Sequence, residues 1–127
     1  TLSLPTELSN KFKSYDTIMY DTTDLVKALA ETDVLYVTRI QKERFATVEE
    51  YQTVQGAYCI DKQLLKTLPA ESIILHPLPR VDELSTDVDT DPRAAYFRQM
   101  EYGLHMRMAL LAWLIESRRM NKKHSEC

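Results

Sequence analysis

The chain has 127 residues, of which 44% are hydrophobic and 28% are charged, as in a single globular domain. Its 16 Lys and Arg against 19 Asp and Glu give a net charge of -3, which argues against a nucleic-acid partner held mainly by its phosphates. The longest apolar run, residues 108–115, is too short to span a membrane, and only two glycines occur, which excludes a Gly-rich phosphate loop. No segment resembles a signal peptide, and Cys59 and Cys127 predict neither a disulfide framework nor a metal cluster, so we expect a reducing, cytoplasmic location.

The first part of the chain predicts a strand, a helix and a second strand. Residues 16–20 (DTIMY) are few and rich in strand-forming residues. Residues 22–32 carry apolar side chains at a helical spacing and begin with Thr22 or Thr23 as the N-cap. Residues 33–38 (DVLYVT) form an almost continuous apolar run, which predicts a strand buried on both faces.

The middle of the chain predicts two short helices and a further strand. Residues 47–54 begin with a cap-like Thr followed by two Glu, and residues 61–68 favour a helix that Pro69 ends. Residues 72–76 (SIILH) predict another buried strand. Because strands alternate with helices, we predict an α/β fold with an open parallel sheet flanked by helices.

A long helix is predicted from about residue 92, with Asp91 as its N-cap and Pro92 in its first turn. Its apolar residues advance by three or four positions and form one packing face: Phe97, Met100, Leu104, Met108, Leu111 and Ile115. With Trp113 and Leu114 alongside, this face is wider than a small sheet needs, so we expect residues 108–115 to be exposed in this chain. Residues 120–127 are polar and aperiodic and predict a disordered tail, which leaves residues 1–119 as the domain.

Polar side chains follow both of the strands predicted to be buried, where open α/β sheets bind their ligands. Arg39 comes after the strand at 33–38, and its planar guanidinium can grip a carboxylate with two parallel hydrogen bonds. In an extended segment Gln41 and Glu43 point to the same side, so Gln41 adds an amide and Glu43 can hold the guanidinium in place. The alternative interpretation is a solvated charge cluster that leads into a helix.

After the strand at 72–76 the chain continues with two prolines separated by one residue. Pro77 and Pro79 remove two backbone N–H groups, so the carbonyls of Pro77 and Leu78 can face an amine or amide donor on a ligand. His76 has two interpretations, since it can polarise a ligand carbonyl or satisfy a backbone group. The residues alone therefore predict a crevice that binds an anion and an amine, with no nucleophile and no metal.

Three segments resemble a known family: VLYVTRIQKERF (34–45), ILHPLPRVDELSTDVDTDPRAAYFRQ (74–99) and RMALLAWLI (107–115). In order and spacing they resemble the aspartate-binding half of the aspartate carbamoyltransferases, over about residues 4–115. The sister ornithine carbamoyltransferases characteristically carry Cys where this chain has Pro77, and a different loop replaces TRIQKER. The resemblance implies the second domain of the carbamoyltransferase fold, incomplete in this chain.

The resemblance also implies a reaction and three binding residues. The family transfers the carbamoyl group of carbamoyl phosphate to L-aspartate, giving N-carbamoyl-L-aspartate and phosphate in pyrimidine biosynthesis, without metal or organic cofactor. Arg39 would bind an aspartate carboxylate, Gln41 would contact the aspartate and the carbamoyl region, and Glu43 would position Arg39. A neutral amine would attack the bound acyl phosphate directly, with catalysis mostly from positioning and electrostatic stabilisation.

Catalytic roles are further implied for the loop that begins at His76, which we call the HPLP loop (His76, Pro77, Leu78 and Pro79). The carbonyls of Pro77 and Leu78 would hold the carbamoyl amide or the incoming amine, and Arg80 would support the loop. The Leu78–Pro79 bond would be cis, a minority form for X–Pro bonds.

The family also needs parts that these 127 residues do not carry. Its carbamoyl-phosphate domain has a Ser-Thr-Arg-Thr-Arg phosphate motif, and a neighbouring subunit of a homotrimer donates a Ser and a Lys. We therefore expect this chain to be one wall of the site and to be inactive alone. The alternatives are a non-catalytic carbamoyltransferase-like binding or scaffold domain, and a receiver-like signalling domain, against which the missing acidic cluster argues.

Overall fold

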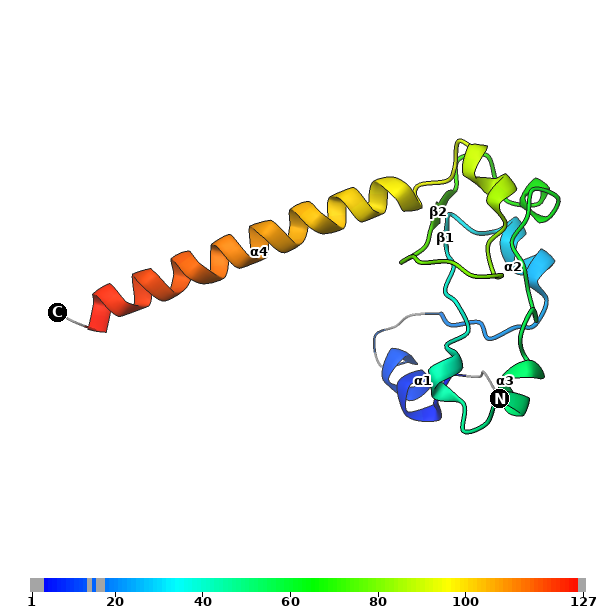
Figure 1. Cartoon of the computed structure of the whole chain (residues 1–127), viewed down its shortest axis with the longest axis horizontal. Coiled ribbons are helices and arrows are strands. Elements are labelled where there is room, and N and C mark those ends of the chain that lie inside the picture. The colour runs from blue at the N-terminus through cyan, green and yellow to red at the C-terminus, as the bar shows by residue number, and fades with distance from the viewer. Residues whose placement is uncertain (1–3, 14, 16–17, 126–127) are drawn as a thin grey trace.

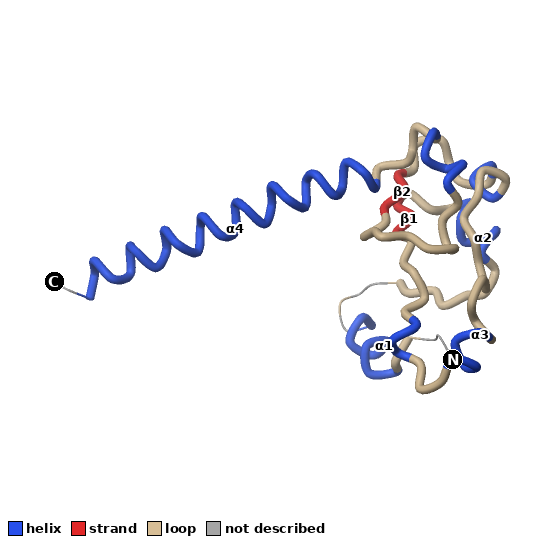
Figure 2. The backbone as a smooth tube through the Cα atoms, viewed as in Figure 1, coloured by secondary structure: helices blue, strands red, loops and turns tan. Residues whose placement is uncertain are grey.

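The computed structural model of the chain describes residues 4–13, 15 and 18–125, which form two parts (Figure 1). An α/β body contains the described residues up to 95, and one long helix, α4 (Tyr96–Ser125), projects away from it. Figure 2 shows that the strands occupy a small region of the body, with helices and long loops around them. None of the described helices is both long enough and apolar enough to cross a membrane.

Two parallel strands form the sheet. β1 (Val34–Tyr36) pairs with β2 (Ile73–Leu75), with the first residue of each strand opposite the first residue of the other. The pairing extends one bond beyond β1, since the Val37 N–H donates to the Leu75 carbonyl at 2.9 Å. The two strands are joined by a helical crossover, as parallel strands require. The predicted α/β fold with a parallel sheet is confirmed.

Only one face of the sheet is buried, so the prediction of strands buried on both faces is wrong. Ile74 is fully buried, whereas Val34 and Tyr36 are 53% and 52% exposed. The buried face packs against the core, which consists of Leu29, Val37, Ile60, Leu65, Leu68, Ile74, Leu84, Val88 and Tyr96. The opposite face is approached by the first turns of α4, with a groove between them. The apolar runs therefore predicted the two strands correctly. They did not predict how many faces of the sheet are covered by the rest of this chain.

α2 (Leu25–Ala30) covers the core and begins one or two residues later than predicted. Its N-cap is Asp24, whose carboxylate accepts a hydrogen bond from the Lys27 N–H at 3.0 Å. Thr22 and Thr23 were the predicted caps, but the Thr22 hydroxyl accepts from the Asp24 N–H at 3.1 Å instead. A carboxylate at this position also interacts favourably with the helix dipole, which explains the choice of Asp24.

Two further short helices lie at the end of the body away from the sheet (Figure 1). α1 (Thr6–Lys13) was not predicted. α3 (Val48–Gln52) begins at the predicted Thr47, whose hydroxyl accepts from the Glu50 N–H at 3.2 Å. The Glu50 carboxylate in turn accepts a hydrogen bond from the Ala46 N–H, just before the helix. Thr47 and Glu50 therefore form a reciprocal pair of capping hydrogen bonds.

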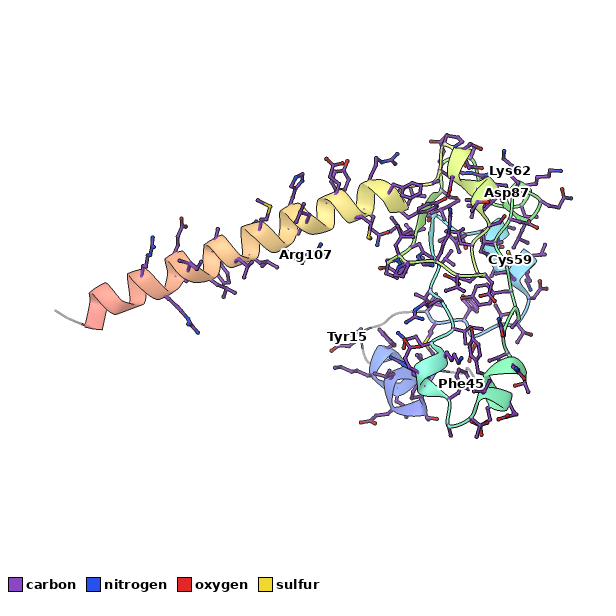
Figure 3. The ribbon with its side chains drawn as sticks, in the orientation of Figure 1. Tyr15, Phe45, Cys59, Lys62, Asp87 and Arg107 are labelled. Carbon is purple, nitrogen blue, oxygen red and sulfur yellow. The ribbon has the colours of Figure 1, made fainter. Side chains whose placement is uncertain are left out.

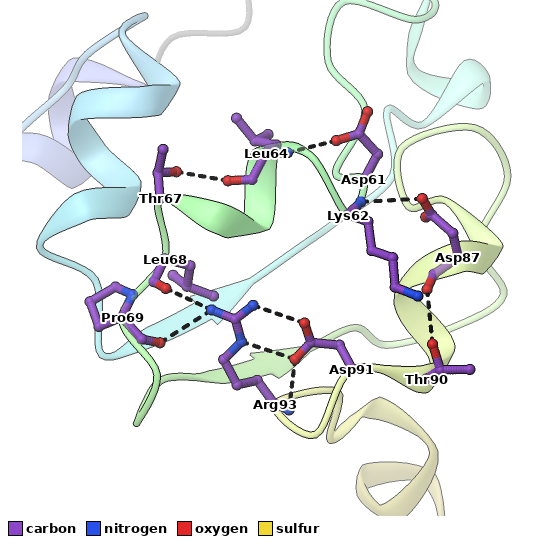
Figure 4. A network of polar contacts seen from close by, with 10 residues as sticks. All are labelled: Asp61, Lys62, Leu64, Thr67, Leu68, Pro69, Asp87, Thr90, Asp91 and Arg93. Carbon is purple, nitrogen blue, oxygen red and sulfur yellow. Dashed lines mark hydrogen bonds and ion pairs between the residues drawn. The ribbon is translucent and has the colours of Figure 1, made fainter.

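The helix predicted over 61–68 is shorter than expected and is one turn of 3-10 helix, Leu64–Lys66. The Asp61 carboxylate accepts from the Leu64 N–H at 2.7 Å, and the Thr67 hydroxyl donates to the Leu64 carbonyl at 2.7 Å (Figure 4). Such side-chain bonds compete with the hydrogen-bond ladder of an α-helix, which explains the tighter turn.

The strand predicted over 16–20 is absent from the described part of that segment. Asp16 and Thr17 lie outside the described residues, and Ile18 to Tyr20 form a loop. A short strand needs a neighbour for its backbone groups, and none of the described residues pairs with this segment.

α4 begins at Tyr96, four residues later than predicted, because the residues before it belong to the body. Asp91 forms a turn instead of capping the helix: its carboxylate accepts from the Arg93 N–H at 2.9 Å and pairs with the Arg93 guanidinium. The same guanidinium donates to the Leu68 carbonyl at 2.6 Å (Figure 4). The Ile74 N–H donates to the Arg93 carbonyl at 2.8 Å, which holds this segment in extended form beside β2.

The other end of α4 also differs from its prediction. The helix continues to Ser125, through most of the segment predicted as a tail, while Glu126 and Cys127 lie outside the described residues. Residues 116–125 contain neither Gly nor Pro. A helix that has already formed continues through such polar residues, because propagation costs far less than initiation.

The middle of α4 carries the exposed apolar surface that the sequence predicts. Its large side chains are between 50% and 62% exposed, and we call them the α4 patch: Met108, Leu111, Trp113, Leu114 and Ile115. Figure 3 shows that the side chains along this part of the helix stand clear of the body. An apolar surface of this kind is typical of a binding face.

Candidate active site

The two motifs leave the sheet at the same edge. β1 and β2 are parallel neighbours, and the bond from the Val37 N–H to the Leu75 carbonyl is the last one before both chains turn away. Thr38 and His76 therefore begin two loops side by side, at the carboxyl ends of the strands. This is the place where open α/β sheets bind ligands.

The first loop brings Arg39 and Glu43 together. An Arg39 Nη2–H donates to the Glu43 carboxylate across one turn of 3-10 helix, Lys42–Arg44. The backbone N–H of Glu43 itself, together with the Arg39 guanidinium, holds the pKa of the Glu43 carboxyl below its ordinary value. The Arg39 side chain is 35% exposed, and most of its five N–H groups face no acceptor among the described residues. The guanidinium is thus oriented and still open to a carboxylate.

Gln41 lies at the start of this 3-10 turn, half-buried, and its backbone carbonyl accepts from the Arg44 N–H at 3.1 Å. The expected extended segment with Arg39, Gln41 and Glu43 on one side is therefore wrong. The turn, not the alternation of a strand, brings Glu43 to Arg39.

Tyr58 fixes the root of the first loop, a contact that the sequence did not indicate. Its hydroxyl donates to the carbonyl of Thr38, the residue before Arg39. Burial and the nearby charge of Glu83 raise the pKa of Tyr58, so the phenol stays protonated as a donor.

The second loop has the backbone shape that the resemblance implied, because the Leu78–Pro79 bond is cis. Leu78 has φ 44°, in the left-handed region that side chains other than glycine rarely adopt. Within the described residues, no hydrogen-bond donor reaches the carbonyls of Pro77 or Leu78. These two acceptors are available to a ligand, as the pair of prolines predicted.

His76 is fully buried, and both of its ring nitrogens are occupied. Nδ1 accepts from the Leu78 N–H at 2.8 Å, and Nε2 lies 2.7 Å from a Glu83 carboxylate oxygen. Of the two interpretations of His76, the structure has the second, in which the ring satisfies a backbone group. Both ring nitrogens of His76 thus hold the HPLP loop, and a catalytic role for His76 stays a prediction.

Arg80 anchors the end of the loop to the body. Its guanidinium forms a two-pronged ion pair with Asp89, with Nη2 to Oδ2 at 2.7 Å, and the Tyr96 hydroxyl donates to the same carboxylate at 2.5 Å. Arg80 lowers the pKa of Asp89 to about 2, and burial together with Asp89 raises the pKa of Tyr96. Arg80 therefore lies where a supporting residue is expected, joined to the first residue of α4.

Gln99 is a second residue that the sequence did not indicate. It lies in the first turn of α4, where its side-chain carbonyl accepts from the His76 N–H at 2.9 Å and its NH₂ donates to the Tyr36 hydroxyl at 3.2 Å. A residue 23 positions along the chain from His76 thus contacts both strands.

The site is an open wall and not an enclosed pocket. A groove of about 1090 Å³ runs along β1 and reaches Thr38 and Tyr58, but its lining does not include Arg39, Gln41 or the HPLP loop. Among the described residues, no three His, Cys, Asp or Glu side chains gather in a way that could hold a metal ion. The groups present can bind an anion through Arg39 and an amine through the open carbonyls.

Comparison with known proteins identifies the family of this chain. Residues 4–114 match the family described as aspartate/ornithine carbamoyltransferase, Asp/Orn binding domain. The chain is 58% identical over 88 residues to the aspartate carbamoyltransferase catalytic subunit of Thermoplasma volcanium, covering 69% of this chain and 29% of that protein. It is 50% identical over 99 residues to the chloroplastic aspartate carbamoyltransferase of Oryza sativa, covering 77% of this chain and 27% of the relative.

Solved structures show the same relationship. The catalytic subunit of the M. jannaschii aspartate transcarbamoylase is 45% identical with a TM-score of 0.79, over 91% of this chain and 38% of that one. The Trypanosoma cruzi enzyme in complex with carbamoyl phosphate and aspartate is 44% identical with a TM-score of 0.71, over 84% and 35%. The chain thus spans well under half the length of these relatives. It belongs to the aspartate/ornithine carbamoyltransferase family and carries that family's Asp/Orn binding domain.

Proposed function

We propose that this chain is the aspartate-binding part of an aspartate carbamoyltransferase of de novo pyrimidine biosynthesis. The enzyme would transfer the carbamoyl group of carbamoyl phosphate to L-aspartate, giving N-carbamoyl-L-aspartate and phosphate. The observation that carries the proposal is the juxtaposition of an oriented, open guanidinium and two open carbonyls at one edge of a parallel sheet. These are the groups that a dicarboxylic amino acid with a reacting amine requires.

Arg39 is the residue we assign to an aspartate carboxylate. A guanidinium matches a carboxylate with two parallel hydrogen bonds, and Glu43 already fixes its direction from the other side. Gln41, on the same loop, would contact the aspartate and the carbamoyl region through an amide that both donates and accepts.

The carbonyls of Pro77 and Leu78 would hold the carbamoyl amide or the attacking amine. The neutral amine forms a C–N bond to the carbamoyl carbon, the C–O bond to phosphate breaks, and the amine loses a proton. Carbonyl acceptors favour this step in two ways. They orient the lone pair of the amine nitrogen toward the carbamoyl carbon, and they accept hydrogen bonds from the amine as it becomes positively charged. No residue of this chain needs to form a covalent intermediate.

The proposal includes partners. A carbamoyl-phosphate domain would supply the phosphate site, and the α4 patch would pack against that domain. A homotrimer would supply a Ser and a Lys from a neighbouring subunit. We call this chain together with the carbamoyl-phosphate domain the complete enzyme. A cytoplasmic location stays a prediction, since the rice relative is chloroplastic.

The choice of acceptor tests the proposal. The complete enzyme is supplied with carbamoyl phosphate and either L-aspartate or L-ornithine, and carbamoylated product is measured. We expect product with aspartate and none with ornithine, because Arg39 would bind the side-chain carboxylate that aspartate has and ornithine lacks, and Pro77 stands where the ornithine enzymes carry Cys. A preference for ornithine would overturn the substrate, and a folded enzyme inactive with both would favour the scaffold alternative.

A further inference from the structure

We propose that Gln99 is a positioning residue for the amine acceptor site, acting on the HPLP loop through His76. This inference rests on the proposed function, since the loop is the part of the site that would hold the amine. Gln99 lies on α4 and not on either motif, and it hydrogen-bonds to Tyr36 on β1 and to His76, the residue that follows β2.

The geometry joins three elements through one side-chain amide. The Gln99 carbonyl accepts from the His76 N–H at 2.9 Å, at the end of β2, and the Gln99 NH₂ donates to the Tyr36 hydroxyl at 3.2 Å, on β1. A glutamine amide is one of the few side chains that offer an acceptor and donors together. The amide therefore fixes the two strand ends relative to each other, from the first turn of the helix.

The same contact reaches the loop carbonyls in two further steps. The His76 ring accepts from the Leu78 N–H at 2.8 Å, so whatever fixes the backbone of His76 also fixes the backbone of Leu78. His76 is fully buried, and without Gln99 its N–H has no partner among the described residues. A buried unsatisfied N–H is costly, so the loop root would move to regain a partner, and the Leu78 carbonyl would move with it.

The carboxylate-binding side of the site is not part of this chain of contacts. Arg39 is oriented by Glu43 on its own loop, and Gln99 contacts neither of them. Loss of Gln99 should therefore disturb the position of the reacting amine more than the binding of the aspartate carboxylate. We expect kcat to fall while the KM for aspartate changes little.

The test compares Gln99→Leu with Gln99→Glu in the complete enzyme. Leucine fills nearly the same space without hydrogen bonds, and we expect kcat to fall about 10- to 100-fold while the KM for aspartate changes less than about threefold. Glutamate keeps an acceptor for the His76 N–H, and its second oxygen can accept from the Tyr36 hydroxyl. We therefore expect Gln99→Glu to retain kcat within about threefold of the unchanged enzyme.

Two tyrosines, Tyr36 and Tyr102, supply a matched pair of variants. Tyr36→Phe removes the hydroxyl that Gln99 contacts, and we expect a kcat loss of about three- to tenfold. Tyr102 lines the groove from α4, and none of the described residues shares a hydrogen bond with its hydroxyl. Tyr102→Phe should leave kcat unchanged.

Amide hydrogen exchange at Leu78 reads the same contact without relying on activity. We expect faster exchange in Gln99→Leu and near-normal exchange in Gln99→Glu. Three results would each overturn the inference. They are normal exchange at Leu78 in Gln99→Leu, a kcat of Gln99→Leu within about twofold of the unchanged enzyme, and a kcat of Gln99→Glu as low as that of Gln99→Leu. If the unchanged enzyme shows no transfer to aspartate, the proposed function fails, and the exchange measurement still decides the role of Gln99. If Gln99→Leu does not fold, Tyr36→Phe and Gln99→Glu still decide it.

Discussion

His76 and Glu83 form a buried pair, with Nε2 to Oε1 at 2.7 Å and side chains that are 0% and 3% exposed. Because Nδ1 accepts from the Leu78 N–H, the ring proton lies on Nε2 and is donated to the carboxylate. Burial raises the pKa of Glu83, but hydrogen bonds from its own N–H, from His76 and from Val81 outweigh burial and hold that pKa below its ordinary value. The HPLP loop is therefore fixed by an ionised carboxylate hydrogen-bonded to the His76 ring.

Removal of this carboxylate should destabilise the domain. In Glu83→Ala the buried Nε2–H of His76 loses its acceptor, and so does the Val81 N–H, which is only partly buried. We expect the free energy of unfolding of the complete enzyme to fall by about 1–3 kcal/mol, measured by urea denaturation. Asp82 is adjacent and exposed, so Asp82→Ala is the control and should change stability by less than about 0.5 kcal/mol. Equal effects of the two substitutions would contradict this account of the loop.

The ion pair between Arg80 and Asp89 should make the free energy of unfolding depend on pH in the acid range. The pKa of Asp89 is lowered from 3.8 to about 2, so its stabilising contribution is present well above 3.8 and is lost as the pH falls toward 2. Asp89→Asn keeps an acceptor for Tyr96 and removes the charge that faces Arg80. We expect a loss of about 1–2 kcal/mol at neutral pH that shrinks toward zero at the acid end, measured by urea unfolding across the pH range. A difference independent of pH would show that the charge of Asp89 does not matter.

The isolated chain should be inactive. In the proposed function Arg39, Gln41 and the HPLP loop would form one wall of the site, and the carbamoyl-phosphate domain would form the other. Purified chain, supplied with carbamoyl phosphate and L-aspartate, should form no N-carbamoyl-L-aspartate in a colorimetric assay. Turnover by the chain, prepared free of any host carbamoyltransferase, would show that the site is assigned to the wrong residues.

The α4 patch should make the isolated chain associate with itself. Its five large side chains, Trp113 among them, have no cover within the described part of the chain. We expect sedimentation velocity to show oligomers whose share rises with protein concentration, and Leu111→Gln together with Trp113→Gln to reduce that share. Glu116→Gln, on the same part of the helix, is the control and should not. A monomer at every concentration would contradict a docking role for this face.

The sequence predicted the placement of the two motifs because that placement follows from topology. Two apolar runs joined by helical segments favour parallel strands, and because the structure pairs them, the residues after each run lie at one edge of the sheet. The contact between Arg39 and Glu43 was expected as well, although a 3-10 turn and not an extended segment produces it. The cis Leu78–Pro79 bond came from the family resemblance and not from the residues themselves.

Other contacts could not be predicted because they join residues far apart in the chain. Tyr58 and Thr38 are 20 positions apart, and Gln99 and His76 are 23 apart, with no periodic signal that links them. The burial of His76 depends on Glu83, which reaches back from the end of the loop. For the same reason the sequence left the two interpretations of His76 open, and the start of α4 was placed too early because Asp91 is paired with Arg93.

The aspartate kinetics of Arg39→Ala in the complete enzyme test the central claim most directly. A guanidinium that binds the substrate carboxylate contributes about 2–4 kcal/mol to transition-state binding, so we expect a higher KM for aspartate, a lower kcat, and kcat/KM reduced about 30- to 1000-fold. Lys66→Ala removes a positive charge from the 3-10 turn at Leu64–Lys66, away from both motif loops, and should leave these constants unchanged. Aspartate kinetics of Arg39→Ala that match those of Lys66→Ala would contradict the assignment of Arg39 and, with it, the proposed aspartate site.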